Sequence, residues 1–161
     1  MEYKIELAQC DDAEELCATQ MAAIEQFSAS DYTPEEINAW MGHVNLPHAL
    51  NTLQDEDTEV FVVRHDDGMV IGFSAARGNQ VTDMYVDPDY CREGIGRALL
   101  RRAEWHIRKQ GKRKIKLLST LNSVDFYESQ GYNKVRKRPM PVNDEMSLEM
   151  IEMRKTFSGE G

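Results

Sequence analysis

Short apolar runs separated by turn signals predict a succession of β-strands. Residues 3–7 alternate between apolar and polar side chains, as in a half-buried strand. The runs at residues 60–63 and 69–73 flank Asp66-Asp67-Gly68, a sequence typical of a β-hairpin. Further strands are expected at residues 81–86, 115–118, 132–135 and 148–153.

Four other segments have apolar residues at helical spacing. They follow Asp12, follow Thr33, run from Ile95 to Gly111, and cover about residues 123–129. Asp11-Asp12 and Thr33 can cap the helices that follow them, with Pro34 at a favoured first position. The segments 42–57 and 136–147 show no regular period, so we expect irregular loops there.

The composition is that of one acidic domain. A chain of 161 residues with 41% hydrophobic residues can build one core, so we expect a single domain over residues 1–157 and a disordered tail at 158–161. The net charge of −9 disfavours nucleic acid as a partner. A basic stretch at residues 97–116 has two interpretations, a solvated helix face or local attraction for a phosphorylated ligand.

The sequence lacks the patterns of a membrane segment, a signal peptide or a metal site. No apolar run is long enough to cross a bilayer, and the N-terminus is not signal-like, which predicts a cytoplasmic protein with no membrane partner. The three cysteines form no C-x-x-C pair, and the four histidines have no ligand spacing. We therefore expect reduced thiols and no metal.

The strand at residues 81–86 leads into a turn that contains two glycines. Gly94 and Gly96 lie where the helix from Ile95 begins, so an anion can approach the backbone and the N–H groups of the first helical turn. A dinucleotide fingerprint would need Gly or Ala where Leu99 stands, and a P-loop would need a Gly-Lys-Ser or Gly-Lys-Thr ending. A tight helix start with no ligand is the remaining alternative.

Two segments resemble the GNAT superfamily of N-acetyltransferases. Residues 86–100 are similar to its motif A, a strand followed by Gln/Arg-x-x-Gly-x-Gly/Ala, and residues 121–132 are similar to its Asn-Ala-x-x-Phe-Tyr-Glu-x-x-Gly-Phe segment. A weaker likeness, at residues 32–40, is to one group of small bacterial members. The resemblance implies an α+β fold, with a mostly antiparallel twisted sheet of about seven strands, splayed at the cofactor site and flanked by about four helices.

The resemblance also implies an acetyl-CoA site. Backbone amides of the turn would hold the pyrophosphate, the end of the preceding strand would pair with pantetheine, and Asn122 would contact the cofactor from the opposite side. The residues so implicated are Met84, Tyr85, Val86, Arg92, Glu93, Gly94, Ile95, Gly96, Arg97 and Asn122. Cys91 stands where the family has Gln or Arg, so we expect less help from that side chain and an intact backbone site.

Acetyl transfer to an amine needs a proton acceptor, a polarised carbonyl and a proton for the departing thiolate. By resemblance, Tyr127 is the general acid, and an amide near Tyr85 or Val86 stabilises the oxyanion. The glutamate that some members use as a general base corresponds here to Gln80. The base therefore stays open between Asp83 and a water relay.

These features predict an enzyme that moves an acetyl group from acetyl-CoA to a primary amine of a small molecule or a peptide. Two alternatives keep the fold without catalysis, namely an acyl-CoA sensor and an interaction module. The acceptor groove is expected around residues 27–53 and 138–145, and the acidic balance suits cationic acceptors. A homodimer is compatible with the sequence.

Overall fold

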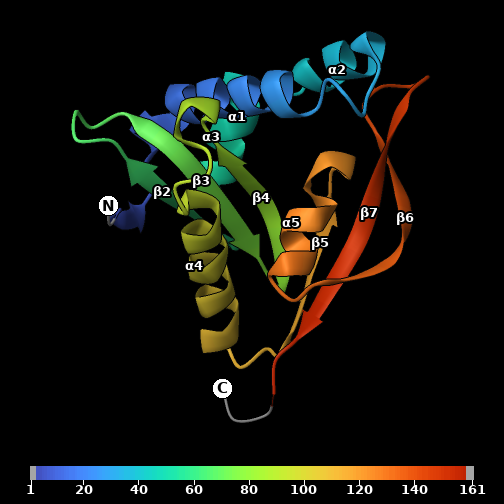
Figure 1. Ribbon diagram of the computed structural model, residues 1–161. Helices are drawn as coiled ribbons and strands as arrows, with labels where there is room; N and C mark the ends of the chain where they lie inside the picture. The colour runs from blue at the N-terminus through green and yellow to red at the C-terminus, as the bar shows by residue number, and fades with distance from the viewer. Residues whose placement is uncertain (1–2, 159–161) are drawn as a thin grey trace.

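A computed structural model describes residues 3–158, which form a seven-stranded sheet between two groups of helices (Figure 1). The strand order is β1-β2-β3-β4-β5-β7-β6, and neighbours are antiparallel except for the parallel pair β4 and β5. This confirms the mostly antiparallel α+β fold. The strands are β1 (Ile5–Leu7), β2 (Thr58–Arg64), β3 (Val70–Arg77), β4 (Gln80–Val86), β5 (Lys114–Ser119), β6 (Asn133–Pro141) and β7 (Ser147–Thr156).

Five α-helices within residues 3–158 cover the two faces of the sheet. They are α1 (Ala13–Phe27), α2 (Pro34–Met41), α3 (Leu46–Gln54), α4 (Ile95–Lys109) and α5 (Val124–Ser129). α1 and α3 pack on one face of β2 to β4, whereas α4 packs on the other face, with α5 beside it (Figure 1). The predicted cap at Thr33 is confirmed, since its hydroxyl accepts a hydrogen bond from Glu36 N at 3.1 Å.

The central strands are buried on both faces. In β2, Val60 and Val62 pack toward α1, while Phe61 and Val63 pack toward α4. Successive side chains of a strand point to opposite faces, so helices on both faces bury four residues in a row. The hairpin between β2 and β3 turns at Gly68, whose φ of 92° suits glycine, as the sequence predicted.

The parallel pair β4 and β5 is joined over a short distance. Gln80 pairs with Lys116 and Val81 with Leu117, and beyond these pairs the strands diverge. Among the described strands, residues 82–86 of β4 consequently have no partner on the β5 side. This is the splayed sheet that the resemblance implied.

A β-bulge in β4 changes which face its side chains reach. Ala75 of β3 pairs with Asp83, but Ala76 pairs with Val81, so Thr82 is an extra residue in the ladder. Val81 therefore packs in the cluster beneath α4, whereas Asp83 lies with residues of α1 and α3. Without the bulge, the alternation of side chains along a strand would place Val81 and Asp83 on the same face of the sheet.

Two predicted loops are wrong. Residues 46–54 form α3, capped by Asn45, whose side chain accepts a hydrogen bond from His48 N at 2.9 Å, and Pro47 is tolerated because it lies in the first turn. Residues 136–141 continue β6, which pairs along its length with β7. Pro139 and Pro141 are compatible with that strand because β6 is at the edge of the sheet.

The start of α1 also differs from the expected cap. Asp12 occupies the capping position, but its side chain does not cap the helix; it accepts hydrogen bonds from Gln9 N and from the Arg64 guanidinium. No helix in the described range is long and apolar enough to span a membrane. Apart from Ser158, the predicted tail lies outside the described residues.

Candidate active site

A cavity of about 960 Å³ extends through the gap between β4 and β5. Its lining comes from β4, the turn before α4, the end of β5 and the segment after it, and α5. Helices α1 to α3, the end of β6 with Val142, and Met150 of β7 complete it, together with Thr58 and Arg77. The cavity thus joins the glycine-containing turn before α4 to the helices α1 to α3 on the other side of the sheet.

The turn before α4 has the geometry of an anion site. Gly94 occupies the N-cap position with φ 84°, and Arg92 also has a positive φ, of 65°. The first intrahelical bond of α4 runs from Ala98 N to Gly94 O at 3.1 Å. The backbone N–H groups of Ile95, Gly96 and Arg97 therefore have no acceptor within the helix. The helix dipole favours negative charge at this end of α4.

Nine of the ten residues named for cofactor binding line this cavity; Glu93 does not. The Glu93 side chain points elsewhere and accepts a hydrogen bond from Tyr3 Oη at 2.5 Å, which ties the turn to the N-terminal segment. Cys91 is exposed and lines the cavity beside Arg92. Of the basic stretch, Arg97 also reaches the lining, whereas Arg102 stacks over aromatic rings outside the cavity.

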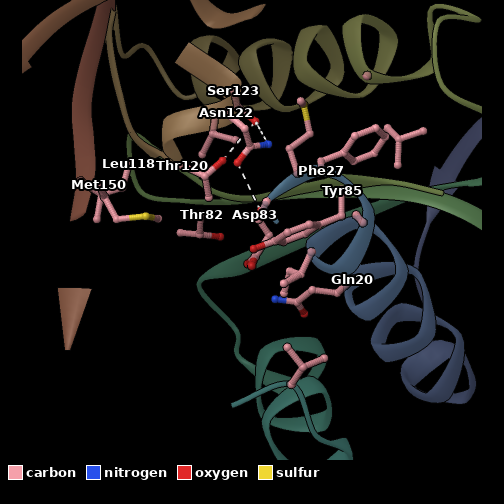
Figure 2. A pocket seen from close by; sticks show the side chains of 18 of the residues that line it. Gln20, Phe27, Thr82, Asp83, Tyr85, Leu118, Thr120, Asn122, Ser123 and Met150 are labelled. Atoms are coloured by element: carbon pink, nitrogen blue, oxygen red, sulfur yellow. Dashed lines mark hydrogen bonds between the residues drawn. The ribbon is translucent and has the colours of Figure 1, made fainter. Parts of the chain in front are cut away.

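Asn122 lies across the cavity from β4 (Figure 2). Its Oδ1 accepts a hydrogen bond from Ser28 Oγ at 3.2 Å, and its Nδ2 lies 3.5 Å from Ser123 Oγ. Ser28 is almost fully buried at the end of α1. This contact fixes the segment after β5 against α1, and sequence reasoning missed it because the two residues are far apart in the chain.

Asp83 projects into the cavity from the α1 side of the sheet, close to Tyr85 and Gln20 (Figure 2). Burial raises the pKa of the Asp83 carboxyl from 3.8 to about 6, although a hydrogen bond from Thr82 acts in the opposite direction. A carboxylate with this pKa is largely ionised at neutral pH and can still accept a proton. Burial, and then the charge of Asp83, raises the pKa of Tyr85.

Tyr127 reaches the same cavity from the opposite face of the sheet. It is 7% exposed and packs among Leu100, Ala103 and Tyr132, in the cluster beneath α4. Burial, followed by the negative charge of Asp83, raises the pKa of the Tyr127 hydroxyl. The phenol therefore keeps its proton at neutral pH and is available as a donor.

An apolar wall, which we define as Ile24, Trp40, Val44, Val142 and Met150, closes the α1 side of the cavity. Tyr32 supports it, because its ring packs edge-on against Trp40 and its hydroxyl donates to Glu149 O at 2.7 Å and accepts from Leu121 N at 3.1 Å. Of the five wall residues, Trp40 alone lies in the segment 32–40 whose weak family likeness the sequence showed.

Several cavity residues were not named as site residues from the sequence. Gln20 comes from α1, while His48, Asn51 and Thr52 come from α3, the helix that was expected to be a loop. Among residues 3–158, no group of three or more His, Cys, Asp or Glu side chains is arranged to bind a metal.

Comparisons with known proteins agree with this architecture. A family model described as an acetyltransferase (GNAT) domain matches residues 28–157. The chain is 22% identical over 127 residues to the uncharacterized N-acetyltransferase YafP of Escherichia coli K12, covering 79% of each protein.

Two solved structures share the fold. One, described as a GCN5-related N-acetyltransferase from Rhodopseudomonas palustris, has a TM-score of 0.89 at 21% identity and covers 98% of this chain and 97% of that one. The other is PaiA N-acetyltransferase from Thermoplasma acidophilum in complex with coenzyme A, with a TM-score of 0.79, 23% identity and coverage of 98% and 100%. With the family match over most of its length, the chain belongs to the GNAT acetyltransferase family.

Proposed function

We propose that the protein transfers an acetyl group from acetyl-CoA to a primary amine by direct attack inside the cavity. The observation that carries this proposal is that Asp83 and Tyr127 enter one cavity from opposite faces of the sheet, at the gap between β4 and β5. A proton acceptor and a proton donor thus lie on opposite sides of the place where a thioester would be cleaved.

Coenzyme A fits the turn by its chemistry. The first-turn amides of α4, together with Arg92 and Arg97, suit a pyrophosphate. A Cβ added at Gly94 would meet no atom within 4 Å, so the backbone there is open to a ligand. The T. acidophilum relative, whose structure contains coenzyme A, supports the same choice. Bound acetyl-CoA would supply the activated acetyl thioester.

The free edge of β4 can polarise the thioester carbonyl. Asp87 N donates to Ile71 O of β3 at 2.8 Å. The N–H groups of an antiparallel strand alternate in direction, so that of Val86 points away from β3 and into the gap. Of the two oxyanion donors considered, Tyr85 and Val86, the latter has the required direction.

The amine nitrogen forms a bond to the acetyl carbon, and the carbon–sulfur bond breaks. Asp83 takes the proton that the amine loses, and the Tyr127 hydroxyl gives a proton to the leaving sulfur. Water then returns both residues to their starting protonation states.

Replacement of Tyr127 by phenylalanine tests this proposal. We expect kcat for thiol release from acetyl-CoA in the presence of an amine to fall about 100-fold, because general acid catalysis contributes on that scale. The Kd of acetyl-CoA, measured by calorimetry, should stay within about twofold, because the turn is untouched. Tyr132→Phe is the matched control, since this buried phenol lies in the same cluster but does not line the cavity.

The competing sensor function predicts a different result. In that case the native protein binds acetyl-CoA, but no amine accelerates thiol release, and Tyr127→Phe changes nothing. Failure of the native protein to bind acetyl-CoA would reject both functions and leave an interaction module.

A further inference from the structure

The charges that line the cavity are unevenly distributed. Arg92 and Arg97 lie at the turn, where the proposed function places the anionic cosubstrate. Beyond the β4–β5 gap, the side facing α1 to α3 contains Asp83, the ion pair of Asp55 with Arg77, and two histidines. Asp83 is consequently the one lining carboxylate without an ion-pair partner among the described residues.

Among the described residues, Arg77 is the one Arg or Lys that lines the α1–α3 side of the cavity, and it is already paired with Asp55. Arg77 Nε lies 3.0 Å from Asp55 Oδ2, and its Nη2 lies 3.8 Å from Asp57 Oδ2. The Asp55 carboxylate also accepts from Thr58 Oγ1 at 2.7 Å. A carboxylate on the acceptor would compete with Asp55 and Asp57 for Arg77, and it would be repelled by the negative charge of Asp83.

The apolar wall faces the same space as Asp83. Trp40 and Val44 are each 5% exposed, and Ile24 is 1% exposed, so the wall is part of the packed core and its shape is fixed. A second ammonium group pushed against this wall would lose its hydration without gaining a counter-ion, which is costly. An apolar group there would gain free energy by leaving water.

Resting on the proposed function, we propose that the acceptor is a monoamine with an apolar body, such as an alkylamine or arylalkylamine. The amine lies at Asp83, and the body lies against the apolar wall. By the same argument, polyamines and free amino acids are poor acceptors, because among residues 3–158 the α1–α3 side of the cavity has neither a second unpaired carboxylate nor an unpaired Arg or Lys.

Matched pairs of acceptors test the proposal on the native protein. Hexanediamine adds one ammonium to hexylamine, and phenylalanine adds one carboxylate to phenethylamine. We expect kcat/KM for each monoamine to exceed that of its charged counterpart by at least about tenfold, the scale expected when a charge is desolvated without a partner. Equal or higher kcat/KM for the diamine or the amino acid would overturn the inference.

A variant designed to prefer a diamine tests where the body of the acceptor lies. Asn51 is an exposed residue of α3 that lines the cavity, and Asn51→Asp adds a carboxylate of the same shape. We expect the ratio of kcat/KM for hexanediamine over hexylamine to rise at least about threefold, through attraction of the second ammonium. Asn133→Asp, at the exposed edge strand β6, is the control and should leave the ratio unchanged.

An error in the acceptor class and an error in the acetyltransferase function would give different results. If amines are acetylated but charged acceptors are preferred, or if Asn51→Asp leaves the ratio unchanged, the acceptor class is wrong and acetyl transfer stands. If acetyl-CoA binds but neither these four acceptors nor a wider panel of small-molecule and peptide amines gives thiol release or an acetylated product by mass spectrometry, the proposed function itself is wrong.

Discussion

At the residue scale, burial of the Asp83 side chain disfavours the ionised form of its carboxyl group. Its pKa of about 6 in the folded protein lies above the ordinary 3.8. The folded state therefore holds the proton more tightly than the unfolded state, and stability falls as pH rises from about 4 to 6. We expect Asp83→Asn to raise the free energy of unfolding by about 3 kcal/mol at pH 8 and by almost nothing at pH 4. Urea unfolding at the two pH values measures this; an equal effect at both would contradict it.

The same carboxyl should set the pH dependence of catalysis. If Asp83 accepts the amine proton, kcat/KM rises with pH through a pKa of about 6. Asp83→Asn should abolish this rise of kcat/KM with pH and lower kcat/KM about 100-fold. His48→Asn is the comparison, because His48 also lines the cavity. If His48→Asn abolishes the rise of kcat/KM with pH, and Asp83→Asn leaves that rise unchanged, His48 is the general base.

The two glycines of the turn should respond differently to alanine. A Cβ at Gly96 would lie 3.7 Å from Phe126 and 3.8 Å from Met84, which are ordinary contacts. Gly96→Ala should therefore keep or slightly raise stability, since alanine favours the helix by about 0.5–1 kcal/mol. The added methyl should raise the Kd of acetyl-CoA about tenfold by keeping the ligand from the backbone.

Gly94→Ala is the counterpart. The space around Gly94 is open, but its φ of 84° makes alanine unfavourable by about 1 kcal/mol. Thermal unfolding together with calorimetry separates the two variants. Unchanged acetyl-CoA affinity in Gly96→Ala would remove that glycine from the site.

The sequence could indicate some of these residues and not others. Gly94 and Gly96 can be recognised in the sequence, because a positive φ angle or a close approach of a ligand to the backbone requires glycine at that position. The face that Asp83 occupies depends on the bulge at Thr82, which simple alternation does not reveal. Gln20 reaches the cavity only through tertiary packing, so no local pattern could identify it.

At the element scale, the position of α4 depends on Gly72 of β3. A Cβ at Gly72 would lie 3.0 Å from both Ile95 Cγ2 and Leu99 Cδ1, which is tighter than most Cβ contacts, so these two residues of α4 would have to shift. Gly72→Ala should therefore push the start of α4 away from the sheet and cost about 1–3 kcal/mol of stability. Because α4 carries the turn, the KM for acetyl-CoA should also rise. Stability like that of the native protein in urea would show that α4 can move without cost.

The elements missed from the sequence were those stabilised by context. α3 is short and has no regular apolar period, which favours interpretation as a loop, although Asn45 followed by Pro47 is the same kind of local start signal as Thr33 followed by Pro34. β6 contains Pro139 and Pro141, which would exclude an inner strand, but the sheet order places β6 at the edge. Strand order is a property of the whole sheet and is not visible in one segment.

At the scale of the whole molecule, the sheet consists of two parts. One comprises β1 to β4 and the other β5, β7 and β6, with two residue pairs between β4 and β5. Side chains beneath α4, including Ala76, Leu100, Ile115 and Met153, form one core cluster across this junction. The parts are therefore held together by side-chain packing on one face, which lets the strands separate at the cavity.

The link between Asp12 and Arg64 should control the acid stability of the whole fold. The guanidinium donates two hydrogen bonds of 2.9 Å to the carboxylate, joining the start of α1 to β2. Burial raises the pKa of Asp12, but the hydrogen bonds from Arg64 and from Gln9 N outweigh it, and the net pKa lies below 3.8. The stabilisation is thus present above about pH 4 and is lost as pH falls through the folded-state pKa.

Arg64→Met should consequently cost about 3 kcal/mol at pH 7, because it leaves a nearly buried carboxylate without its cation. The difference from the native protein should shrink as the pH falls toward 3, where protonation removes the charge that Arg64 neutralises. Arg77→Met is the matched control, since that pair is more exposed and should contribute less than about 1 kcal/mol at either pH. A cost that stays constant between pH 7 and pH 3 would mean that Arg64 stabilises the fold by packing rather than by its charge, since packing does not titrate.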